Sequence, residues 1–203
     1  MPEITSVTPQ KKDKTRCNIE VDGKFYCGMK LDTVIANGLK VGMSVDLATL
    51  SLIQLESEKL TALDKALRHI SVSMKTEKEI RLFLKQKGYL QDVTDYVLDK
   101  MKEYGYVDDA MYASSYVEGA AKRKGSRLLQ LELRQKGVDG EIIDSVLSSL
   151  EDETESAQRC LEKYMRGKPF DETTLKKAYR NLLSKGFDYD TCRQAIERLK
   201  DED

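Results

Sequence analysis

One stretch of this chain occurs three times at a spacing of 49 residues, the distance from Gly88 to Gly137 and from Gly137 to Gly186. The copies align without a gap and read LKQKGYLQDVTDYVLDKM (84–101), LRQKGVDGEIIDSVLSSL (133–150) and LLSKGFDYDTCRQAIERL (182–199). Such a period is typical of a tandem array in which each unit packs mainly against its neighbours. An array of this kind excludes most single-core folds.

Each copy has the pattern of a helix that ends at glycine, followed at once by a second helix. In the middle copy, Leu133 and Val138 flank Gly137 at the positions of the hydrophobic pair in a Schellman cap. Lysine precedes the glycine in all three copies and complements the negative end of the helix dipole. Asp139 and Asp188 are predicted N-caps of the following helices. The first copy has Leu90 there, so its helix is expected to begin at Gln91 or Asp92.

A third amphipathic stretch lies upstream of each copy, because the same offset aligns Leu63 with Tyr112 and Leu161. The sequence therefore predicts a mainly α fold of three tandem three-helix repeats in an elongated, curved array. We expect the repeats at 59–106, 107–154 and 155–203, behind an N-terminal β-hairpin region and linking helix at 1–58.

Asp22-Gly23 lies between two β-prone runs and predicts a tight hairpin in which Val21 pairs with Lys24. In that register Cys17 faces Gly28 and Cys27 faces Asn18, so the two thiols point to opposite faces and a disulfide between them is not expected. The segment NGLKVGMSVD (37–46) is expected to form turns and a last strand before a helix that begins near Asp46.

Charge and composition limit the functions that the chain can have. The chain has 34 Lys+Arg and 35 Asp+Glu, so contact with nucleic acid must come from a local patch. It has no apolar run long enough for a membrane helix and no secretory signal pattern, and we expect a cytoplasmic monomer. The four cysteines form no CxxC or Cys/His cluster, so neither a metal nor another cofactor is predicted.

Signals of catalysis are weak. The lone histidine, His69, has no motif around it and is expected on a helix surface or near a helix end. A phosphate-binding P-loop requires Gly before Lys after a strand, whereas every copy here has Lys before Gly at a helix end. We therefore expect no catalytic residue and no enzymatic activity.

The most basic segment is AKRKGSRLLQLELRQKG (121–137), in which Glu132 is the one acidic residue. Its part from Lys122 to Arg127 could be a solvated loop between helices, or the segment could be a surface for phosphates or an acidic partner. Related lysines occur in the other repeats. The basic residues predicted to bind a partner are Lys85, Lys87, Lys122, Arg123, Lys124, Arg127, Arg134, Lys136 and Lys185. Several tyrosines lie nearby, and most are expected in the core.

Two segments carry a resemblance to a known family: YGYVDDAMYASSYVEGAAKRKGSRLLQLELRQKGV (104–138) and KKAYRNLLSKGFDYDTCRQAI (176–196). They resemble the RecX family of bacterial regulatory proteins, which modulate the RecA recombinase, and the likeness extends over nearly the whole chain. It implies tandem three-helix repeats and an N-terminal hairpin like that of the longer members from Gram-positive bacteria.

The resemblance also implies a function without catalysis: binding along the RecA filament groove, which lowers strand exchange, ATP hydrolysis and coprotease activity. Carried over by position, Asp108, Asp109 and Tyr112 and the basic segment match the family pattern best.

Two other interpretations stay open. The repeats could bind single- or double-stranded DNA through the basic segment, in a salt-sensitive manner. They could also form a helical adaptor for some other partner.

Overall fold

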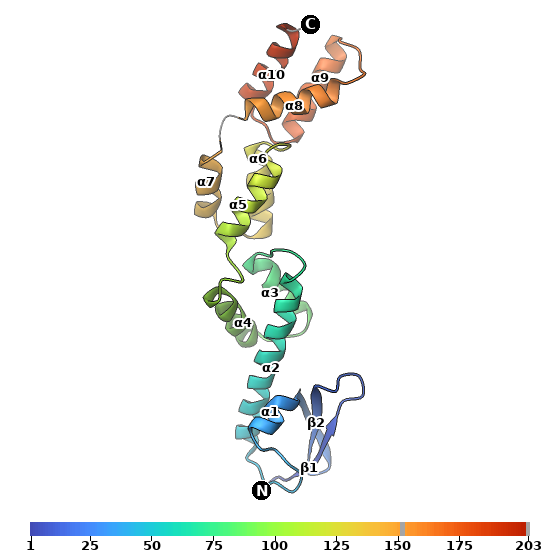
Figure 1. Cartoon of the computed structure of the whole chain (residues 1–203), viewed down its shortest axis with the longest axis vertical. Coiled ribbons are helices and arrows are strands. Elements are labelled where there is room, and N and C mark those ends of the chain that lie inside the picture. The colour runs from blue at the N-terminus through green and yellow to red at the C-terminus, as the bar shows by residue number, and fades with distance from the viewer. Residues whose placement is uncertain (151–152, 202–203) are drawn as a thin grey trace. The chain divides into compact units, whose positions relative to one another are not determined.

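The computed structural model describes residues 1–150 and 153–201, in which the chain forms ten helices and three strands (Figure 1). The described chain forms two compact units. The first contains residues 1–73 and 80–106, and the second contains residues 74–79 and 107–203. Four residues of the predicted second and third repeats, 151, 152, 202 and 203, lie outside the described residues.

The first unit begins with an antiparallel sheet of β1 (Ile4–Pro9), β2 (Arg16–Val21) and β3 (Lys24–Lys30), in the order β1-β2-β3. The predicted turn is confirmed, because Val21 pairs with Lys24 and both turn residues, Asp22 and Gly23, have positive φ angles of 49° and 74°. The strand β1 was not predicted. It pairs with the outer edge of β2 and enlarges the predicted hairpin to a three-stranded sheet.

The predicted partners of the two N-terminal cysteines are wrong. The β2–β3 register shifts at Ile19, so that Cys27 pairs with Ile19 and Cys17 with Met29. A bulge that inserts one residue into a strand reverses which face the following side chains occupy. Cys17 and Cys27 consequently lie on the same buried face, and both are free thiols.

Two helices follow the sheet, α1 (Leu31–Ala36) and α2 (Leu47–Ile70). The predicted start of α2 is confirmed: the Asp46 carboxylate accepts the backbone N–H of Thr49 at 3.0 Å and caps the helix. The helix α1 was not predicted. The expected strand within 37–46 is wrong, since this segment forms turns with a single bridge from Ser44 to Glu3.

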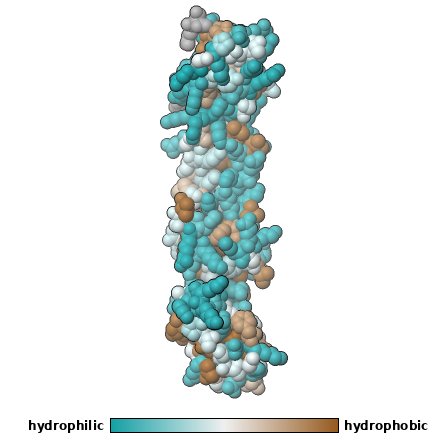
Figure 2. Space-filling view, turned by 90° about the vertical axis from the view of Figure 1, so that its right-hand side faces the viewer, coloured by the Kyte–Doolittle hydropathy of each residue, from teal (hydrophilic) through white to brown (hydrophobic). Residues whose placement is uncertain are grey.

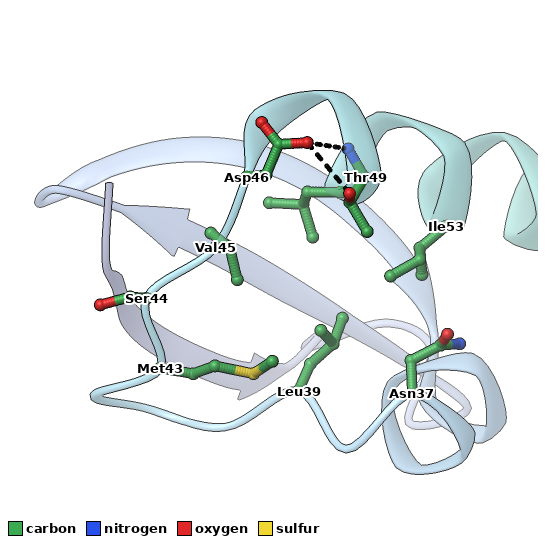
Figure 3. Close-up of a pocket in the computed structure, with 9 residues that line it drawn as sticks. Asn37, Leu39, Met43, Ser44, Val45, Asp46, Thr49 and Ile53 are labelled. Carbon is green, nitrogen blue, oxygen red and sulfur yellow. Dashed lines mark hydrogen bonds between the residues drawn. The ribbon is translucent and has the colours of Figure 1, made fainter. Parts of the chain in front are cut away.

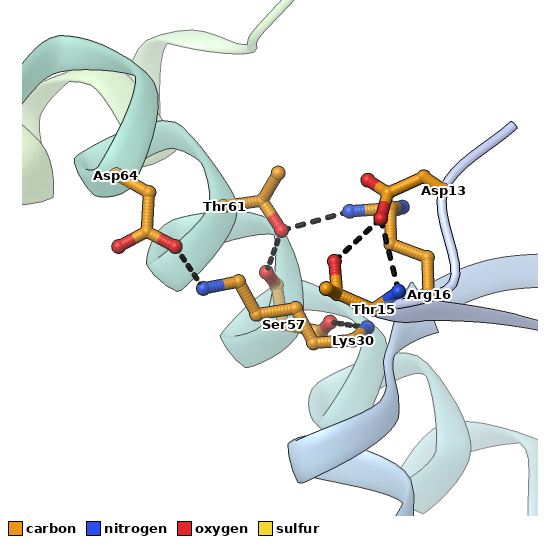
Figure 4. Close-up of polar contacts among 7 residues, drawn as sticks. All are labelled: Asp13, Thr15, Arg16, Lys30, Ser57, Thr61 and Asp64. Atoms are coloured by element: carbon orange, nitrogen blue, oxygen red, sulfur yellow. Dashed lines mark hydrogen bonds and ion pairs between the residues drawn. The ribbon is translucent and has the colours of Figure 1, made fainter. Parts of the chain in front are cut away.

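Polar contacts attach the sheet to the middle of α2 (Figure 4). The Ser57 hydroxyl, fully buried, accepts the backbone N–H of Lys30 at 2.6 Å. The Arg16 guanidinium donates to the Thr61 hydroxyl at 2.8 Å, and the Lys30 ammonium pairs with the Asp64 carboxylate. Because α2 continues into the first repeat, these contacts make the sheet and that repeat parts of one unit.

Each repeat contains three helices, as predicted. The first repeat has the end of α2 with α3 (Glu77–Gln86) and α4 (Gln91–Glu103), and the second has α5 (Asp109–Ala120), α6 (Ser126–Lys136) and α7 (Gly140–Ser148). The third has α8 (Thr154–Met165), α9 (Glu172–Ser184) and α10 (Tyr189–Asp201). The exact boundaries between repeats stay a prediction.

The three predicted glycine caps are confirmed. Gly88, Gly137 and Gly186 have φ angles of 84°, 86° and 88°, in the left-handed region where glycine is favoured. In the second repeat the N–H of Gly137 donates to the Arg134 carbonyl, and the N–H of the next residue donates to the Leu133 carbonyl. This pair of bonds defines the Schellman motif.

The predicted starts of the following helices are also confirmed. Asp139 and Asp188 accept backbone N–H groups of α7 and α10 through their side chains. In the first repeat Leu90 precedes α4 without a side-chain cap, and the helix begins at Gln91.

Two junctions in the second unit use the same kind of acceptor, a lysine carbonyl, at positions 49 residues apart. The Thr76 hydroxyl donates to the Lys136 carbonyl at 2.7 Å, and the Gly125 N–H donates to the Lys185 carbonyl at 2.9 Å. In both cases the start of a middle helix meets the Lys-Gly corner of the next repeat. Within the second unit, the 49-residue period therefore recurs in these contacts as well as in the helices.

Candidate partner-binding surface

The basic segment of the second repeat, residues 121–137, consists of the loop 121–125 after α5, all of α6 and the Gly137 cap. Asp108 starts α5 by accepting the N–H groups of Ala110 and Met111 at 2.8 and 2.9 Å. Asp109 accepts the N–H of Glu77 at 2.9 Å and so caps the start of α3. Both of these predicted contact residues have a structural task, and their role in partner binding stays a prediction.

Lys124 is neutralised within the second repeat. Its ammonium lies 2.6 and 2.7 Å from the two Glu132 oxygens and 3.1 Å from the Tyr116 hydroxyl, which itself donates to Glu132 at 2.6 Å. The hydrogen bond to Glu132 raises the pKa of Lys124. Burial acts to raise the pKa of Glu132, but the hydrogen bonds from Lys124 and Tyr116 outweigh it and lower that pKa. The charge of Lys124 is thus offset internally.

Lys136 is neutralised in the same way at the junction with residues 74–79. Its ammonium lies 2.5 Å from the Glu79 carboxylate, and this hydrogen bond raises the pKa of Lys136. Tyr112 stacks on Tyr116 with ring centroids 6.2 Å apart, and burial raises the pKa of its phenol. Lys136 and Tyr112 therefore belong to the packing around this junction.

The remaining cations of the segment are exposed to different degrees and separate into several places. Arg134 is exposed on α6, and the Arg127 guanidinium lies 5.1 Å from the Tyr189 ring centre. Lys122 lines a hollow that also contains Glu118, Glu153, Glu155 and Arg159, so its surroundings are of mixed charge. The basic segment is consequently not one continuous patch.

Arg123 and Lys185 come together in a hollow of about 250 Å³ in the second unit. Lys163, Tyr164, Asn181 and Cys160 complete its lining, and no carboxylate belongs to that lining. The sequence analysis missed Lys163, Tyr164 and Asn181, because none of them stands in a repeated position or a basic run. Only the packing of α8 and α9 against the loop 121–125 brings them to the same place.

Lys85 and Lys87 belong to the first unit. Lys85 is exposed at the end of α3, and the Lys87 ammonium lies 5.5 Å from the Phe83 ring centre. Lys87 also lines a hollow of about 330 Å³ with Asp13, Arg16, Glu58, Thr61, Lys65, Gly88 and Tyr89. Acidic and basic side chains both line this hollow, so it favours neither sign of charge.

A second hollow of the first unit is mainly apolar (Figure 3). It has a volume of about 290 Å³ and lies between the turns at 37–46 and the start of α2. Leu39, Met43, Val45, Leu50 and Ile53 supply most of its lining, and Asn37, Ser44, Asp46 and Thr49 supply the polar part. The Asp46 carboxylate is engaged by Thr49, as Figure 3 shows, so this hollow presents no free catalytic pair.

Signs of catalytic or metal chemistry are sparse. His69 is half-buried in the last turn of α2 and stacks on Phe83 with ring centroids 4.0 Å apart, as expected for a histidine near a helix end. Within residues 1–150 and 153–201, no group of three His, Cys, Asp or Glu side chains could hold a metal ion.

None of the described helices combines the length and the apolar character needed to cross a membrane. In the view of Figure 2, hydrophilic residues dominate the surface and hydrophobic ones form small separate groups.

Comparison with known proteins relates this chain to one family from end to end. Four family models match: "Regulatory protein RecX N-terminal domain" at residues 2–46, and the first, second and third RecX three-helix domains at 62–101, 108–147 and 151–196. "Regulatory protein RecX" of Clostridium perfringens is 32% identical, with 98% of this chain and 97% of that protein covered. This chain belongs to the RecX family. The resemblance read from the sequence is thereby confirmed.

Other RecX proteins extend the comparison. The RecX protein of Bacillus subtilis is 33% identical over all of this chain and 79% of its own length. A crystal structure of a regulatory protein RecX has a TM-score of 0.70 at 26% identity, covering 97% of this chain and 100% of the other. RecX from Lactobacillus salivarius has a TM-score of 0.63 at 25% identity over 70% of this chain and 97% of the other. These RecX relatives carry the name of a regulatory protein and not of an enzyme.

Proposed function

We propose that this chain regulates the RecA recombinase by binding its filament on DNA in the cytoplasm, without catalysis of its own. The observation that carries the proposal is the match to RecX models in the sheet region and in all three repeats, with relatives named regulatory proteins. Binding in the filament groove or at the growing end lowers ATP hydrolysis, strand exchange and coprotease activity. Recombinational DNA repair and the SOS response are the processes affected.

The repeated architecture suits a partner that is itself repetitive. Three similar helical units can contact successive protomers of a filament, and weak contacts joined in one chain add through a high effective concentration. Inhibition by such binding requires no reactive group.

The exposed cations are the best candidates for the contact. Arg127 and Arg134 are exposed, whereas Lys124 and Lys136 are held by Glu132 and Glu79. Exposed charges at the rim of an interface mainly raise the association rate, so their removal lowers binding most at low salt.

The test measures the DNA-dependent ATPase of RecA on single-stranded DNA with substoichiometric amounts of the purified chain. We expect ATP hydrolysis to fall with the wild-type chain and with the control Lys24→Glu/Lys40→Glu, two exposed lysines of the first unit. Arg127→Glu/Arg134→Glu is expected to inhibit less, with the largest difference at low salt. Unchanged ATPase and strand exchange with the wild-type chain would refute the proposal.

A further inference from the structure

We propose that the hollow lined by Arg123, Lys163 and Lys185 binds a phosphate group of a nucleic acid strand. The hollow lies where the loop 121–125 meets α8 and the end of α9. This inference goes beyond the regulation of RecA and does not depend on it, because the ligand is the nucleic acid and no recombinase is required.

Backbone contacts fix two walls of the hollow. The N–H of Gly125 donates to the Lys185 carbonyl at 2.9 Å, which holds the end of α9 against the loop. The Cys160 thiol lies 3.8 Å from the Arg123 carbonyl oxygen and connects α8 to the same loop. The three cations therefore project from a joined framework, and their convergence does not require a prior change of backbone.

The charge of this hollow is uncompensated among the described residues. Lys124 and Lys136 each have a carboxylate within 2.7 Å, whereas no described carboxylate lies within ion-pair distance of Arg123, Lys163 or Lys185. The Arg123 guanidinium makes a long contact of 3.4 Å to the Gly119 carbonyl. Three cations that have no acidic partner among residues 1–150 and 153–201, gathered in one concavity, attract an anion from solution.

The polar side chains around the cations are hydrogen-bond donors as well. Asn181 contributes an amide and Tyr164 a phenol, and the Lys168 ammonium lies 3.1 Å from the centre of the Tyr164 ring. Arginine presents several N–H groups in a fork that matches phosphate oxygens, and lysine adds a mobile point charge. The hollow therefore combines charge with directional donors.

The arrangement of the donors favours phosphate over carboxylate. Arg123 comes from the loop, Lys163 from α8, and Asn181 and Lys185 from α9 and its end. Donors that approach from several directions suit a tetrahedral group, whereas a planar carboxylate is satisfied by a single arginine fork. The volume of about 250 Å³ also admits a phosphate together with its attached sugar.

The test is fluorescence anisotropy of a labelled oligothymidine titrated with the full chain, without RecA, over a range of salt concentrations. The variant Arg123→Gln/Lys163→Gln/Lys185→Gln removes the three cations of the hollow. The control Lys24→Gln/Lys40→Gln/Arg68→Gln removes three exposed cations of the first unit and changes the net charge equally. Circular dichroism with an unchanged thermal midpoint shows that each variant is folded.

We expect the hollow variant to bind about 5-fold more weakly at about 0.1 M salt, and the slope of log K against log salt to decrease by about 0.7, since one phosphate contact is lost from a single strand. The control is expected to keep the wild-type slope. In the wild-type chain, the side-chain amide signals of Asn181 should shift in NMR spectra when the unlabelled oligonucleotide is added.

Three results would overturn the proposal. Equal losses in the hollow variant and the control would show diffuse attraction to the whole protein. Displacement of the oligonucleotide by dTMP or inorganic phosphate at equal phosphate concentration would assign the hollow to a free nucleotide or ion. Displacement by polyglutamate as effectively as by unlabelled oligonucleotide would assign it to an acidic protein. The proposed function is tested separately by the RecA ATPase assay. A chain that binds the oligonucleotide through the hollow but does not inhibit RecA would refute the proposed function and leave this inference intact.

Discussion

Gly125 lies directly against the backbone of Gly186: a β-carbon at position 125 would come within 2.4 Å of the Gly186 carbonyl oxygen. The neighbouring N–H of Arg127 donates to the same carbonyl at 3.2 Å. The junction between the second and third repeats thus depends on the absence of a side chain at Gly125. A β-carbon cannot be accommodated there by rotation of a flexible side chain, because the nearest atoms are backbone.

We expect Gly125→Ala to lower the free energy of unfolding of the second unit by about 1–3 kcal/mol, the typical cost of overpacking. The φ angle of Gly125 is -82°, which alanine adopts readily, so the loss would come from the close approach alone. Urea unfolding followed by circular dichroism measures the effect. The matched control is Gly119→Ala, within α5, where a β-carbon meets no atom within 4 Å.

Gly119→Ala should instead stabilise the chain by up to about 1 kcal/mol, since alanine is the better helix former. If both variants shift the urea midpoint in the same direction, the junction is not as tightly packed as the contact at Gly125 indicates.

The Asp188 carboxylate should raise the free energy of unfolding at neutral pH, and this contribution should disappear in acid. The N–H of Thr191 donates to its carboxylate at 2.7 Å and, together with weaker interactions, lowers the pKa of Asp188. Because the pKa in the folded state is below the unfolded value of about 3.9, the contribution is present above that pH and is lost as the pH falls through the folded pKa. We expect Asp188→Ala to lose about 1 kcal/mol at neutral pH.

Asp188→Asn separates the cap from the charge, because asparagine caps helices as well as aspartate does. It should keep most of the neutral-pH stability but lose less stability than the wild type on acidification, as measured by urea unfolding at several pH values. Glu197→Gln, which removes an exposed carboxylate of the same helix, is the control. Identical acid profiles for Asp188→Asn and the wild type would contradict the prediction.

Ser57→Ala should weaken the attachment of the sheet to α2. It removes the acceptor of the partly buried Lys30 N–H, and an unsatisfied buried donor costs about 1–3 kcal/mol, so we expect a loss near the lower end of this range. Hydrogen exchange at the Lys30 amide and urea unfolding both report this change. Ser114→Ala, on an exposed face of α5, should alter stability by less than about 0.5 kcal/mol. Unchanged protection of the Lys30 amide would show that the hydroxyl is not its partner.

The four thiols should be unreactive in the folded chain. Burial raises the pKa of Cys27 and of Cys192 to about 11, and Cys17 and Cys160 are buried as well. Since the thiolate is the reactive form, we expect a disulfide reagent at pH 8 to react slowly with the native protein. After denaturation, the reagent should react with all four thiols. Ser148→Cys places a thiol on an exposed helix end and should add one fast equivalent. Fast reaction of the wild type would contradict the burial.

The elements that the sequence predicted correctly are local in the chain. The Schellman cap at Gly137 joins residues at most five positions apart, and Asp139 caps a helix that begins at the next residue. The Asp22-Gly23 turn likewise depends on two adjacent residues with positive φ angles. Such features follow from backbone sterics and the chemistry of a few neighbouring side chains.

The errors have the opposite character. The bulge at Ile19 changed the partners of both N-terminal cysteines, and no glycine or other local signal marks it in the sequence. The strand β1 pairs with β2 across a loop, and its alternation of side chains is too irregular to show a strand by itself. Both features depend on pairing between strands and not on the residues adjacent in the sequence.

The candidate surface was predicted only in part. The basic segment was found from its composition, but Lys136 is neutralised by Glu79, 57 residues away, and Lys124 by Glu132 on the next helix. The cations of the hollow, which have no carboxylate partner in the described part of the chain, come from the loop 121–125, α8 and the end of α9. Composition counts charges without showing which of them are paired.

By itself, the sequence determined the repeat, its period and the caps, because these depend on short-range patterns that recur three times. It also determined the family, through two characteristic segments. The tertiary structure alone decided which of the described cations are paired with a carboxylate and which ones share a hollow. The physical reason is that pairing and burial depend on distances between side chains from different helices. Arg123 and Lys185, 62 positions apart, share a hollow only because the Gly125 backbone closes against the Lys185 carbonyl.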